Sequence, residues 1–494
     1  MTKDKNIINF MDYIKRDKIE DVKKNLKNKL KKIQERNRGV SYTEYGKVEV
    51  NERKFAKYIV SRINLFRLDT NERYIENQET KGYETVSEVT IGKICMHIMD
   101  EYNDDYYFKY VKENRLVNYI DKYIPTYRKL IIDDKYILFP NGIYDIENFS
   151  FDSKFETETT LTFQMGFAYD PDAECPEWKK ALKKMFPEDR ESIISIIQEM
   201  FGYTFLYGKT PADTLFYLWG KGRNGKSIIT NVLRLLHGVE NIAGVPLADL
   251  NERYNLSAIY DKRVCICPEN AKEKIKDTST LKALTGRDLI KVEKKYEDPF
   301  TINIPTKIIV NSNHYLRTDD TSNGFWERIL PIPFDVTFLN ENELMKVKKS
   351  EYFCLRDVSL EDKLEKELPG IFNWSLEGLR RLQSNQWMFT YSEKVAMLKA
   401  EMMMYCKPVA AFVSQCVEQG NDNKENGKRD LVKSSLVRER FLEWAEKKSL
   451  NTFEFKDSRA FRQAFEESLK EHGIIARIGK KSVDYYYGIK LKEE

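Results

Sequence analysis

The stretch from Gly220 to Ser227 has the residue types and the spacing of a phosphate-binding loop. Its sequence, GKGRNGKS, fits the pattern G-x-x-x-x-G-K-[ST] and lies between the apolar run TLFYLW and the helical pattern SIITNVLRLLHG. Gly220 and Gly225 permit backbone angles at which successive amides converge on phosphate oxygens, and the following helix N-terminus adds a positive dipole. The expected nucleotide-binding residues are Gly220, Lys221, Gly222, Arg223, Asn224, Gly225, Lys226, Ser227 and Ile228.

Two side chains of this loop are expected to act on the nucleotide directly. Lys226 would reach the β- and γ-phosphates, and Ser227 would offer a hydroxyl to Mg²⁺, which prefers hard oxygen ligands and keeps several waters. ATP and Mg²⁺ are therefore the expected cofactors. The alternative interpretation is a glycine turn with a chance lysine, and the strand before the loop and the helix after it argue against that.

A carboxylate is expected at the end of a second strand. The run from Arg263 to Cys267 is a short apolar strand, and Glu269 follows its carboxyl end, where ligands gather in open α/β sheets. We expect Glu269 to orient or deprotonate the attacking water and to reach Mg²⁺ through water. The commoner motif has two adjacent acids, but Pro268 precedes Glu269, so the second protein ligand of the metal stays open. A solvated carboxylate is the alternative.

Length, composition and charge set limits on the elements that position these groups. A chain of 494 residues is expected to form about three domains. Its 82 Lys+Arg against 78 Asp+Glu give a net charge of +4, so any nucleic-acid surface must be local. Seven scattered cysteines and four distant histidines show neither a zinc spacing nor a disulfide framework. No run approaches eighteen apolar residues, so a soluble cytoplasmic protein without a membrane contact is expected.

Patterns around the loop predict further elements. The turn Pro140-Asn141-Gly142 separates two strand-like runs and predicts a hairpin. Apolar residues at helical spacing from Pro176 to Met200 predict helices that lead into the nucleotide-binding segment. A lysine-rich helical pattern between Ile14 and Ile33 predicts either a solvated helix or a basic arm on DNA phosphates.

The segment from Leu281 to Phe334 resembles the core of superfamily 3 helicases, and more narrowly the poxvirus and phage primase-helicase branch of that family within the AAA+ ATPases. The resemblance extends over residues 138–382. It implies an α/β fold: an AAA+ P-loop ATPase core with a helical N-terminal region and a C-terminal winged-helix domain.

The resemblance also assigns roles to two residues that spacing alone leaves undefined. Asn313 matches the polar sensor residue that helps to place the water, with Asn311 as a less favoured choice. Arg328 matches the arginine that such ATPases project into a neighbouring subunit's site, with Arg317 as a secondary candidate. The plainer alternatives are a turn-forming asparagine and a surface ion pair of Arg328 with Glu327 or another acid.

Expected DNA contacts lie on two parts of the chain. Lys294, Lys295 and Tyr296 lie at the tip of a predicted hairpin, which in superfamily 3 proteins enters the central channel of a ring; lysines bind phosphates and tyrosine packs on bases. A solvated hairpin is the alternative. The segment 431–492 resembles the winged-helix module of related initiator helicases and is expected to bind duplex DNA at an origin, unless it is a protein-interaction domain. Its expected contacts are Arg459, Arg462, Lys480 and Lys481.

These observations predict four domains and one function. The domains are an N-terminal basic helix and small α/β domain (1–115), a helical domain (116–205), the superfamily 3 AAA+ ATPase (206–395), and a linker with a winged helix (396–494). The resemblance implies an ATP-dependent replicative DNA helicase and replication initiator of a mobile genetic element, similar to those of phages and staphylococcal pathogenicity islands. It would act as a homo-oligomeric ring, with a hexamer expected. The alternatives are a primase-helicase fusion and a DNA-binding AAA+ regulator that does not unwind.

Overall fold

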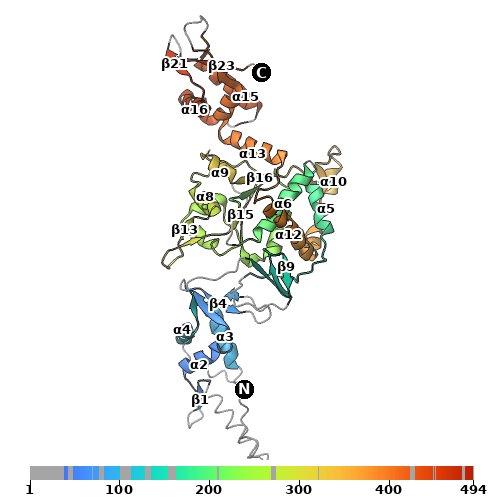
Figure 1. Ribbon diagram of the computed structural model, residues 1–494, viewed down its shortest axis with the longest axis vertical. Helices are drawn as coiled ribbons and strands as arrows, with labels where there is room; N and C mark the ends of the chain where they lie inside the picture. The colour runs from blue at the N-terminus through green and yellow to red at the C-terminus, as the bar shows by residue number, and fades with distance from the viewer. Residues whose placement is uncertain are drawn as a thin grey trace, which may run out of the picture. The chain divides into compact units, whose positions relative to one another are not determined.

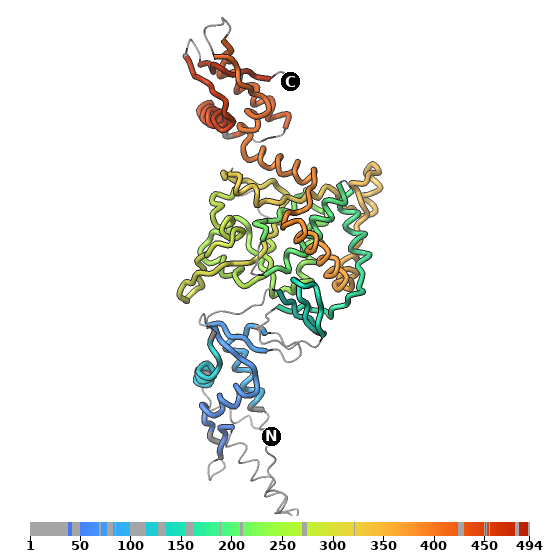
Figure 2. The backbone as a smooth tube through the Cα atoms, in the orientation of Figure 1, coloured from blue at the N-terminus to red at the C-terminus, as the bar shows by residue number. Residues whose placement is uncertain are grey.

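The computed structural model describes most of the chain (Figures 1 and 2). The described residues are 38–42, 48–68, 71–76, 83–100, 113–127, 135–153, 163–187, 189–207, 211–268, 274–320, 322–422, 429–448, 450, 452–480 and 484–492. The predicted basic helix between Ile14 and Ile33 lies outside them. Contacts divide the chain into two compact units, residues 1–144 with 151–164, and residues 145–150 with 165–494.

The first unit contains a small α/β fold. Its elements are β1 (Val40–Tyr42), β2 (Val48–Val50), α2 (Glu52–Val60), β3 (Leu65–Leu68), β4 (Arg73–Glu76), β5 (Tyr83–Thr85), α3 (Glu88–Asp100), α4 (Glu113–Tyr123) and β6 (Thr126–Tyr127). The strands form a β1-β2 hairpin and a sheet of order β5-β4-β3-β6. Helix α2 begins after Asn51, whose side chain accepts a hydrogen bond from the Lys54 amide at 3.0 Å. The helices share an apolar core that includes Phe55, Ile91 and Ile120.

The predicted hairpin around Pro140 is present. Strands β7 (Tyr136–Phe139) and β8 (Gly142–Asp145) are neighbours in a three-stranded sheet that β9 (Ser150–Asp152) completes. Gly142 has a φ of +156° and lies so close to β9 that a Cβ there would meet the Asp152 carbonyl oxygen at 2.4 Å. This approach explains the glycine at the turn.

A five-stranded parallel sheet forms the centre of the second unit. Its strands are β10 (Leu215–Trp219), β11 (Ile242–Ala243), β12 (Val264–Cys267), β15 (Lys307–Ser312) and β16 (Ile329–Pro333), in the order β11-β12-β15-β10-β16. Strands β10, β12 and β16 are continuous apolar runs, and β15 is apolar at its centre, because a parallel sheet is covered on both faces. The α/β prediction is therefore confirmed at the level of a central parallel sheet.

Helices and short elements surround this sheet. They are α5 (Pro176–Met185), α6 (Arg190–Thr204), α7 (Lys226–His237), α8 (Ser279–Gly286), β13 (Leu289–Val292), β14 (Phe300–Asn303), α9 (Asn323–Glu327), β17 (Thr337–Leu339), α10 (Glu341–Leu344), β18 (Phe353–Leu355), α11 (Leu360–Lys366), α12 (Leu368–Ser384) and α13 (Glu393–Cys406). In Figure 1, α5, α6 and α12 lie on one side of the unit and α8 with β13 on the other.

The described residues between 408 and 492 contain three α-helices and short strands. The elements are α14 (Pro408–Cys416), β19 (Val417–Gln419), β20 (Leu431–Lys433), α15 (Ser434–Lys447), α16 (Ser458–Glu471), β21 (Arg477–Lys480), β22 (Asp484–Tyr487) and β23 (Ile489–Leu491). The strands pair as β20-β22-β21 and β19-β23. An aromatic core of Phe412, Phe441, Phe461, Phe465 and Tyr486 holds them together. The winged-helix assignment remains a prediction.

Among the described residues, none of the helices combines the length and the apolar character that a bilayer crossing requires.

Helices α6 and α12 cross at close range around an ion pair between a buried carboxylate and a partly exposed arginine. A Cβ on Gly378 would meet the Gln198 carbonyl oxygen at 2.3 Å, so glycine sets the approach. The Glu199 carboxylate is fully buried, pairs with the Arg381 guanidinium at 2.6 Å, and accepts hydrogen bonds from the Thr390 amide at 2.8 Å and hydroxyl at 2.6 Å. This network joins the helix that precedes the central sheet to the helix that follows it.

Replacing Glu199 with alanine removes the acceptor and leaves Arg381 without its carboxylate. We expect Glu199→Ala to lower the free energy of unfolding by about 1–3 kcal/mol, measured by urea denaturation followed by circular dichroism, because Arg381 is partly exposed and keeps Gln198 and the Ser195 carbonyl oxygen as acceptors. Glu191→Ala, on the exposed first turn of the same helix, is the control and should cost less than about 0.5 kcal/mol. Equal effects of the two substitutions would contradict the buried network.

Candidate nucleotide-binding site

The loop between β10 and α7 has the backbone geometry of an anion cradle. Gly222 and Gly225 have φ values of +98° and +95°, in the left-handed region that favours glycine. A Cβ on Gly220 would meet the Phe334 carbonyl oxygen at 2.5 Å, so this position is also restricted to glycine. Among the described residues, no protein acceptor binds the amides of Asn224, Gly225 or Ser227. These donors at the start of α7 fit a phosphate chain.

Lys226 and Asn313 come together at the carboxyl edge of the sheet. The Lys226 ammonium is buried and donates to the Gly220 carbonyl oxygen, to Asn224 Oδ1 at 3.1 Å and to Asn313 Oδ1 at 2.9 Å. Asn313 directly follows β15, the strand next to β10. Asn311 lies inside β15, opposite Leu218. The structure therefore places Asn313, rather than Asn311, against the loop lysine.

The Mg²⁺ ligands are described only in part. Ser227 lies on the first turn of α7, where a metal bound to the phosphates would be reached. Glu269 lies outside the described residues, while β12, the strand that leads to it, ends at Cys267 beside β15. The donor on this chain that the structure locates is thus the Ser227 hydroxyl, which fits a hard cation bound mainly by phosphates and water.

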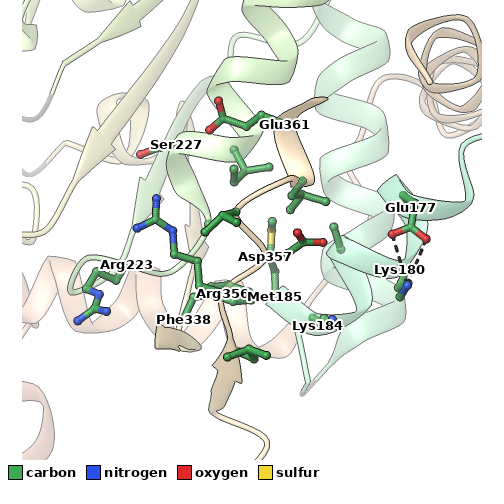
Figure 3. Close-up of a pocket in the computed structure, with 16 residues that line it drawn as sticks. Glu177, Lys180, Lys184, Met185, Arg223, Ser227, Phe338, Arg356, Asp357 and Glu361 are labelled. Atoms are coloured by element: carbon green, nitrogen blue, oxygen red, sulfur yellow. Dashed lines mark hydrogen bonds and ion pairs between the residues drawn. The ribbon is translucent and has the colours of Figure 1, made fainter. Parts of the chain in front are cut away.

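A cavity of about 370 Å³ opens beside the loop (Figure 3). Gly225, Ser227 and Ile228 form one wall, α5 forms a second, and the segment from Phe338 to Glu361 forms a third. The wall is largely apolar and carries several charged groups, a composition common in ligand sites. A Cβ on Gly225 would lie 2.8 Å from the sulfur of Met185, so α5 is packed directly against the loop.

The side chain of Arg223 turns away from the cradle. Its backbone φ is +53°, and its guanidinium forms a two-pronged ion pair with Glu343 on α10, at 2.9 and 2.5 Å. The hydrogen bond from Arg223 holds the pKa of Glu343 down at about 2. The Arg223 carbonyl also accepts the Phe338 amide at 2.7 Å. Arg223 therefore attaches the loop to the segment after β16.

Arg328 lies at the opposite edge of the sheet from the loop. Its carbonyl oxygen accepts the amide of Leu215, the first residue of β10, whereas the loop begins after the last residue of that strand. The five residues of β10 therefore place the Arg328 backbone about 15–20 Å from the start of the loop. The guanidinium bonds the Gly324 carbonyl oxygen and lies 3.5 Å from Asp213. An ion pair is thus present, with Asp213 rather than with Glu327.

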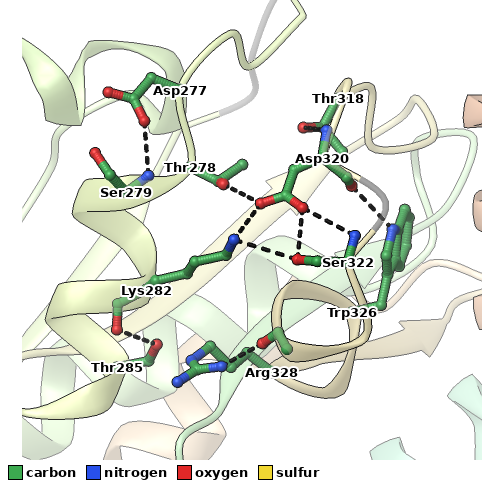
Figure 4. A network of polar contacts seen from close by, with 11 residues as sticks. Asp277, Thr278, Ser279, Lys282, Thr285, Thr318, Asp320, Ser322, Trp326 and Arg328 are labelled. Carbon is green, nitrogen blue, oxygen red and sulfur yellow. Dashed lines mark hydrogen bonds and ion pairs between the residues drawn. The ribbon is translucent and has the colours of Figure 1, made fainter.

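A polar network fixes the loop between Asn313 and Arg328 (Figure 4). The Asp320 carboxylate contacts the Lys282 ammonium at 2.5 Å, accepts the Ser322 hydroxyl at 2.6 Å and also accepts the Thr278 hydroxyl. Burial raises the pKa of Asp320, but the hydrogen bonds from Lys282, Ser322 and Thr278 outweigh it and hold the pKa well below its ordinary value. Asp320 therefore joins α8, which leads into the β13–β14 hairpin, to α9, which leads to the arginine.

The predicted DNA-binding residues of the hairpin differ in their surroundings. Tyr296 is fully exposed and has a φ of +67°, so it projects from the tip. Lys295 is exposed, with its ammonium 5.9 Å from the centre of the Tyr254 ring. Lys294 packs instead over Tyr260 at 4.8 Å. The tip thus presents one aromatic ring and one lysine.

The predicted contacts of the C-terminal part are also unequal. Arg459 is exposed on α16. Arg462, on the same helix, is paired with Glu466 at 2.8 Å and with Asp484 at 3.0 Å. The side chain of Lys480 and the whole of Lys481 lie outside the described residues. Of the two predicted contacts whose side chains the structure describes, Arg459 is therefore the one that is exposed to a ligand.

Two features of the site had no predicted counterpart. The first is the segment from Phe338 to Glu361, which comes after the motifs in the sequence and contacts the loop only in the folded chain. Arg253 and Tyr254 lie beside the hairpin, with Arg253 bonded to Glu293 and Tyr254 near Lys295. A capping box at Asn340 and Glu343 was visible in the sequence as N-x-x-E, but nothing there indicated Arg223 as the partner.

Comparisons with known proteins place the chain near viral helicases. Residues 218–328 match a family of unknown function, DUF5906, and residues 124–187 match the family described as D5 N terminal like. A candidate helicase of Acanthamoeba polyphaga mimivirus is 25% identical over 265 residues, 50% of this chain and 27% of that protein. A candidate helicase of Invertebrate iridescent virus 6 is 28% identical over 275 residues, 49% of this chain and 26% of that protein.

The chain spans about a quarter of the length of these curated relatives. Two structures of the apo NrS-1 C-terminal region are 15% identical to it, with TM-scores of 0.48 and 0.46; the alignments cover 90% and 89% of this chain and 100% and 99% of those chains. A likeness this distant bears on neither mechanism nor partner. The sequence matches support a helicase-like family of D5 type.

The Asp320 network predicts a pH-dependent contribution to stability. Folding lowers the pKa of Asp320. The stabilisation by its ionised carboxylate is therefore complete above the unfolded-state pKa of about 3.9 and is lost as the pH falls below that value. We expect Asp320→Asn to cost about 1–2 kcal/mol at pH 7. The difference from wild type should stay constant from pH 8 to 5 and shrink below about pH 4, measured by urea denaturation at each pH. A difference that grows on acidification would contradict the assignment.

Proposed function

We propose that the chain is an ATP-driven DNA helicase of the superfamily 3 type that works as a ring of identical subunits. The contact between Lys226 and Asn313 carries the ATPase part of this proposal, because it brings a phosphate-binding cation and a polar sensor to one edge of the sheet. The similarity to viral helicases supports unwinding. The strand order, in which β15 lies between β10 and β12, supports the AAA+ assignment.

The position of Arg328 supports hydrolysis between subunits. In its own chain it lies an estimated 15–20 Å from the loop, at the other edge of the sheet, so it acts on a phosphate only in the site of a neighbouring copy. There its guanidinium would neutralise charge that develops on the γ-phosphate. Water would then attack the γ-phosphate and release ADP, with Lys226, Asn313 and Glu269 of one subunit and Arg328 of the next around the reacting groups. A bound Mg²⁺ would supply electrostatic stabilisation of the phosphates.

The hairpin supplies the proposed contact with single-stranded DNA. Tyr296 presents an exposed ring for stacking, and Lys295 supplies a cation for the backbone. Asp320 connects the helix that leads into this hairpin to the helix that leads to Arg328, which is a route from hydrolysis to movement. Replication initiation on a mobile element and duplex binding through Arg459 extend the proposal.

Mixing two inactive variants tests hydrolysis between subunits. Lys226→Ala removes the loop cation, and Arg328→Ala removes the proposed partner arginine, with an expected loss of about 10³-fold in turnover for each. An equal mixture should regain activity, because about a quarter of the interfaces in randomly mixed rings pair an intact Lys226 with an intact Arg328. Steady-state ATPase rates of the two variants and the mixture are compared. A mixture as inactive as its components, although mass measurement shows mixed oligomers, would refute this arrangement.

Substitutions at the hairpin tip test the DNA contact. Removing the ring in Tyr296→Ala should weaken binding to a single-stranded oligonucleotide by about tenfold and slow strand displacement on a forked duplex. Fluorescence anisotropy and a gel-based displacement assay measure the two effects. Lys291→Ala is the matched control, because Lys291 lies on β13 and is paired with Glu293 at 2.8 Å. Displacement by Tyr296→Ala at the wild-type rate would contradict the hairpin contact, whereas a wild-type protein that binds DNA but displaces no strand would argue for the non-unwinding regulator.

A further inference from the structure

The cavity beside the loop contains a cation whose role the proposed ATPase motifs leave undefined. Arg356 lies between β18 and α11, in the segment that forms the third wall. Figure 3 shows its side chain extending across the cavity toward the side where Ser227 lies. We propose that Arg356 binds the phosphate chain of the nucleotide held by its own subunit. This inference rests on the proposed function.

Charge and direction together single out Arg356. Lys184 is a second exposed cation that lines the cavity without an ion pair to a described carboxylate, but Figure 3 shows it on the far side of the cavity from Ser227. Arg223 is neutralised by Glu343, and Lys180 is bonded to Glu177 at 3.1 Å. Among the described residues, no carboxylate lies within ion-pairing distance of the exposed Arg356 guanidinium. Its neighbour Asp357 is occupied by Lys363 at 2.7 Å. A phosphate is an acceptor that a guanidinium binds with two parallel hydrogen bonds.

The backbone on both sides of Arg356 is fixed relative to the loop. The Arg356 amide donates to the Leu339 carbonyl oxygen at 2.8 Å, at the end of β17. The residue before Leu339 is Phe338, and its amide donates to the Arg223 carbonyl oxygen at 2.7 Å. After Arg356, the Asp357 carboxylate accepts the Ser359 amide at 3.0 Å and closes a turn. Two backbone hydrogen bonds, through the adjacent residues Phe338 and Leu339, therefore link the Arg356 backbone to the phosphate-binding loop.

The residues that share the cavity with Arg356 indicate which phosphates it binds. They are Gly225, Ser227 and Ile228, at the start of α7, whereas Lys226 points to Asn313 and does not line the cavity. Lys226 is thus placed for the γ-phosphate side and Arg356 for the α- and β-phosphates. The apolar groups of Met185, Phe338 and Leu355 line the same cavity and suit the nucleoside.

The assignment predicts that Arg356 matters equally for ATP and ADP. We expect Arg356→Ala to raise the Kd of Mg²⁺–ADP and of the Mg²⁺ complex of the non-hydrolysable β,γ-imido analogue of ATP by about tenfold or more, and to leave the Kd of adenosine unchanged. Arg356→Lys should show an intermediate loss. Isothermal titration of the full-length protein measures these values, and thermal unfolding of each variant checks that the exposed substitution leaves the fold intact.

Lys180→Ala is the matched control, since it removes a cation that lines the same cavity but is already paired. Its effect on either Kd should be less than about twofold. Nucleotide affinity in Arg356→Ala equal to that of wild type, equal losses in Lys180→Ala and Arg356→Ala, or a parallel loss for adenosine would each overturn the role of Arg356. A wild-type protein that binds neither nucleotide would instead overturn the proposed ATPase itself.

Discussion

The parallel central sheet is the constraint on which the rest of the structure depends. All five strands run in one direction, so groups that follow strands gather at one edge and groups that precede strands gather at the other. Lys226 and Asn313 follow β10 and β15, whereas Arg328 precedes β16. A single chain cannot bring the arginine to the loop without dismantling the sheet. In the proposed ring, assembly of two copies would unite them.

Further contacts connect Arg328 and the loop after Asn313 with the helix that leads into the β13–β14 hairpin. The Arg328 guanidinium lies close to both Gly324 and Gly286, the latter at the end of the helix that leads into the hairpin. Asp320 fastens that helix to the loop that follows Asn313. The loop after Asn313, Arg328 and the helix that leads into the hairpin are thus close neighbours, joined in part by the Asp320 contacts. In the proposed ring, these neighbours would connect the phosphates of one subunit with the hairpin tip of the next.

How much the sequence could predict depended on the range of the interactions. The loop from Gly220 to Ser227, the strand that ends before Asn313 and the hairpin tip at Tyr296 are local patterns, and the structure has each of them where it was expected. The predicted α/β class is confirmed as a central parallel sheet. The roles assigned to the site residues, and the four domain boundaries, stay predictions.

Other features of the site could not be predicted from the sequence, because they depend on partners that are distant along the chain. Arg223 was assigned to the nucleotide from its position in the motif, yet its side chain pairs with Glu343, 120 residues away. Arg462 was assigned to DNA, yet it is held by Asp484. Arg356 carries no motif, and its position near the loop arises from β17, which pairs with β18 and bonds to Arg223. Such contacts between residues far apart leave no periodic signal.

The central claim is that the catalytic site is completed between two copies of the chain. Its most direct test is ATP turnover per chain over a range of protein concentrations, with the oligomeric state determined at each one by analytical ultracentrifugation. The account predicts that turnover per chain rises with the fraction of assembled chains and falls toward zero for the monomer. Constant turnover on dilution to monomers would contradict it.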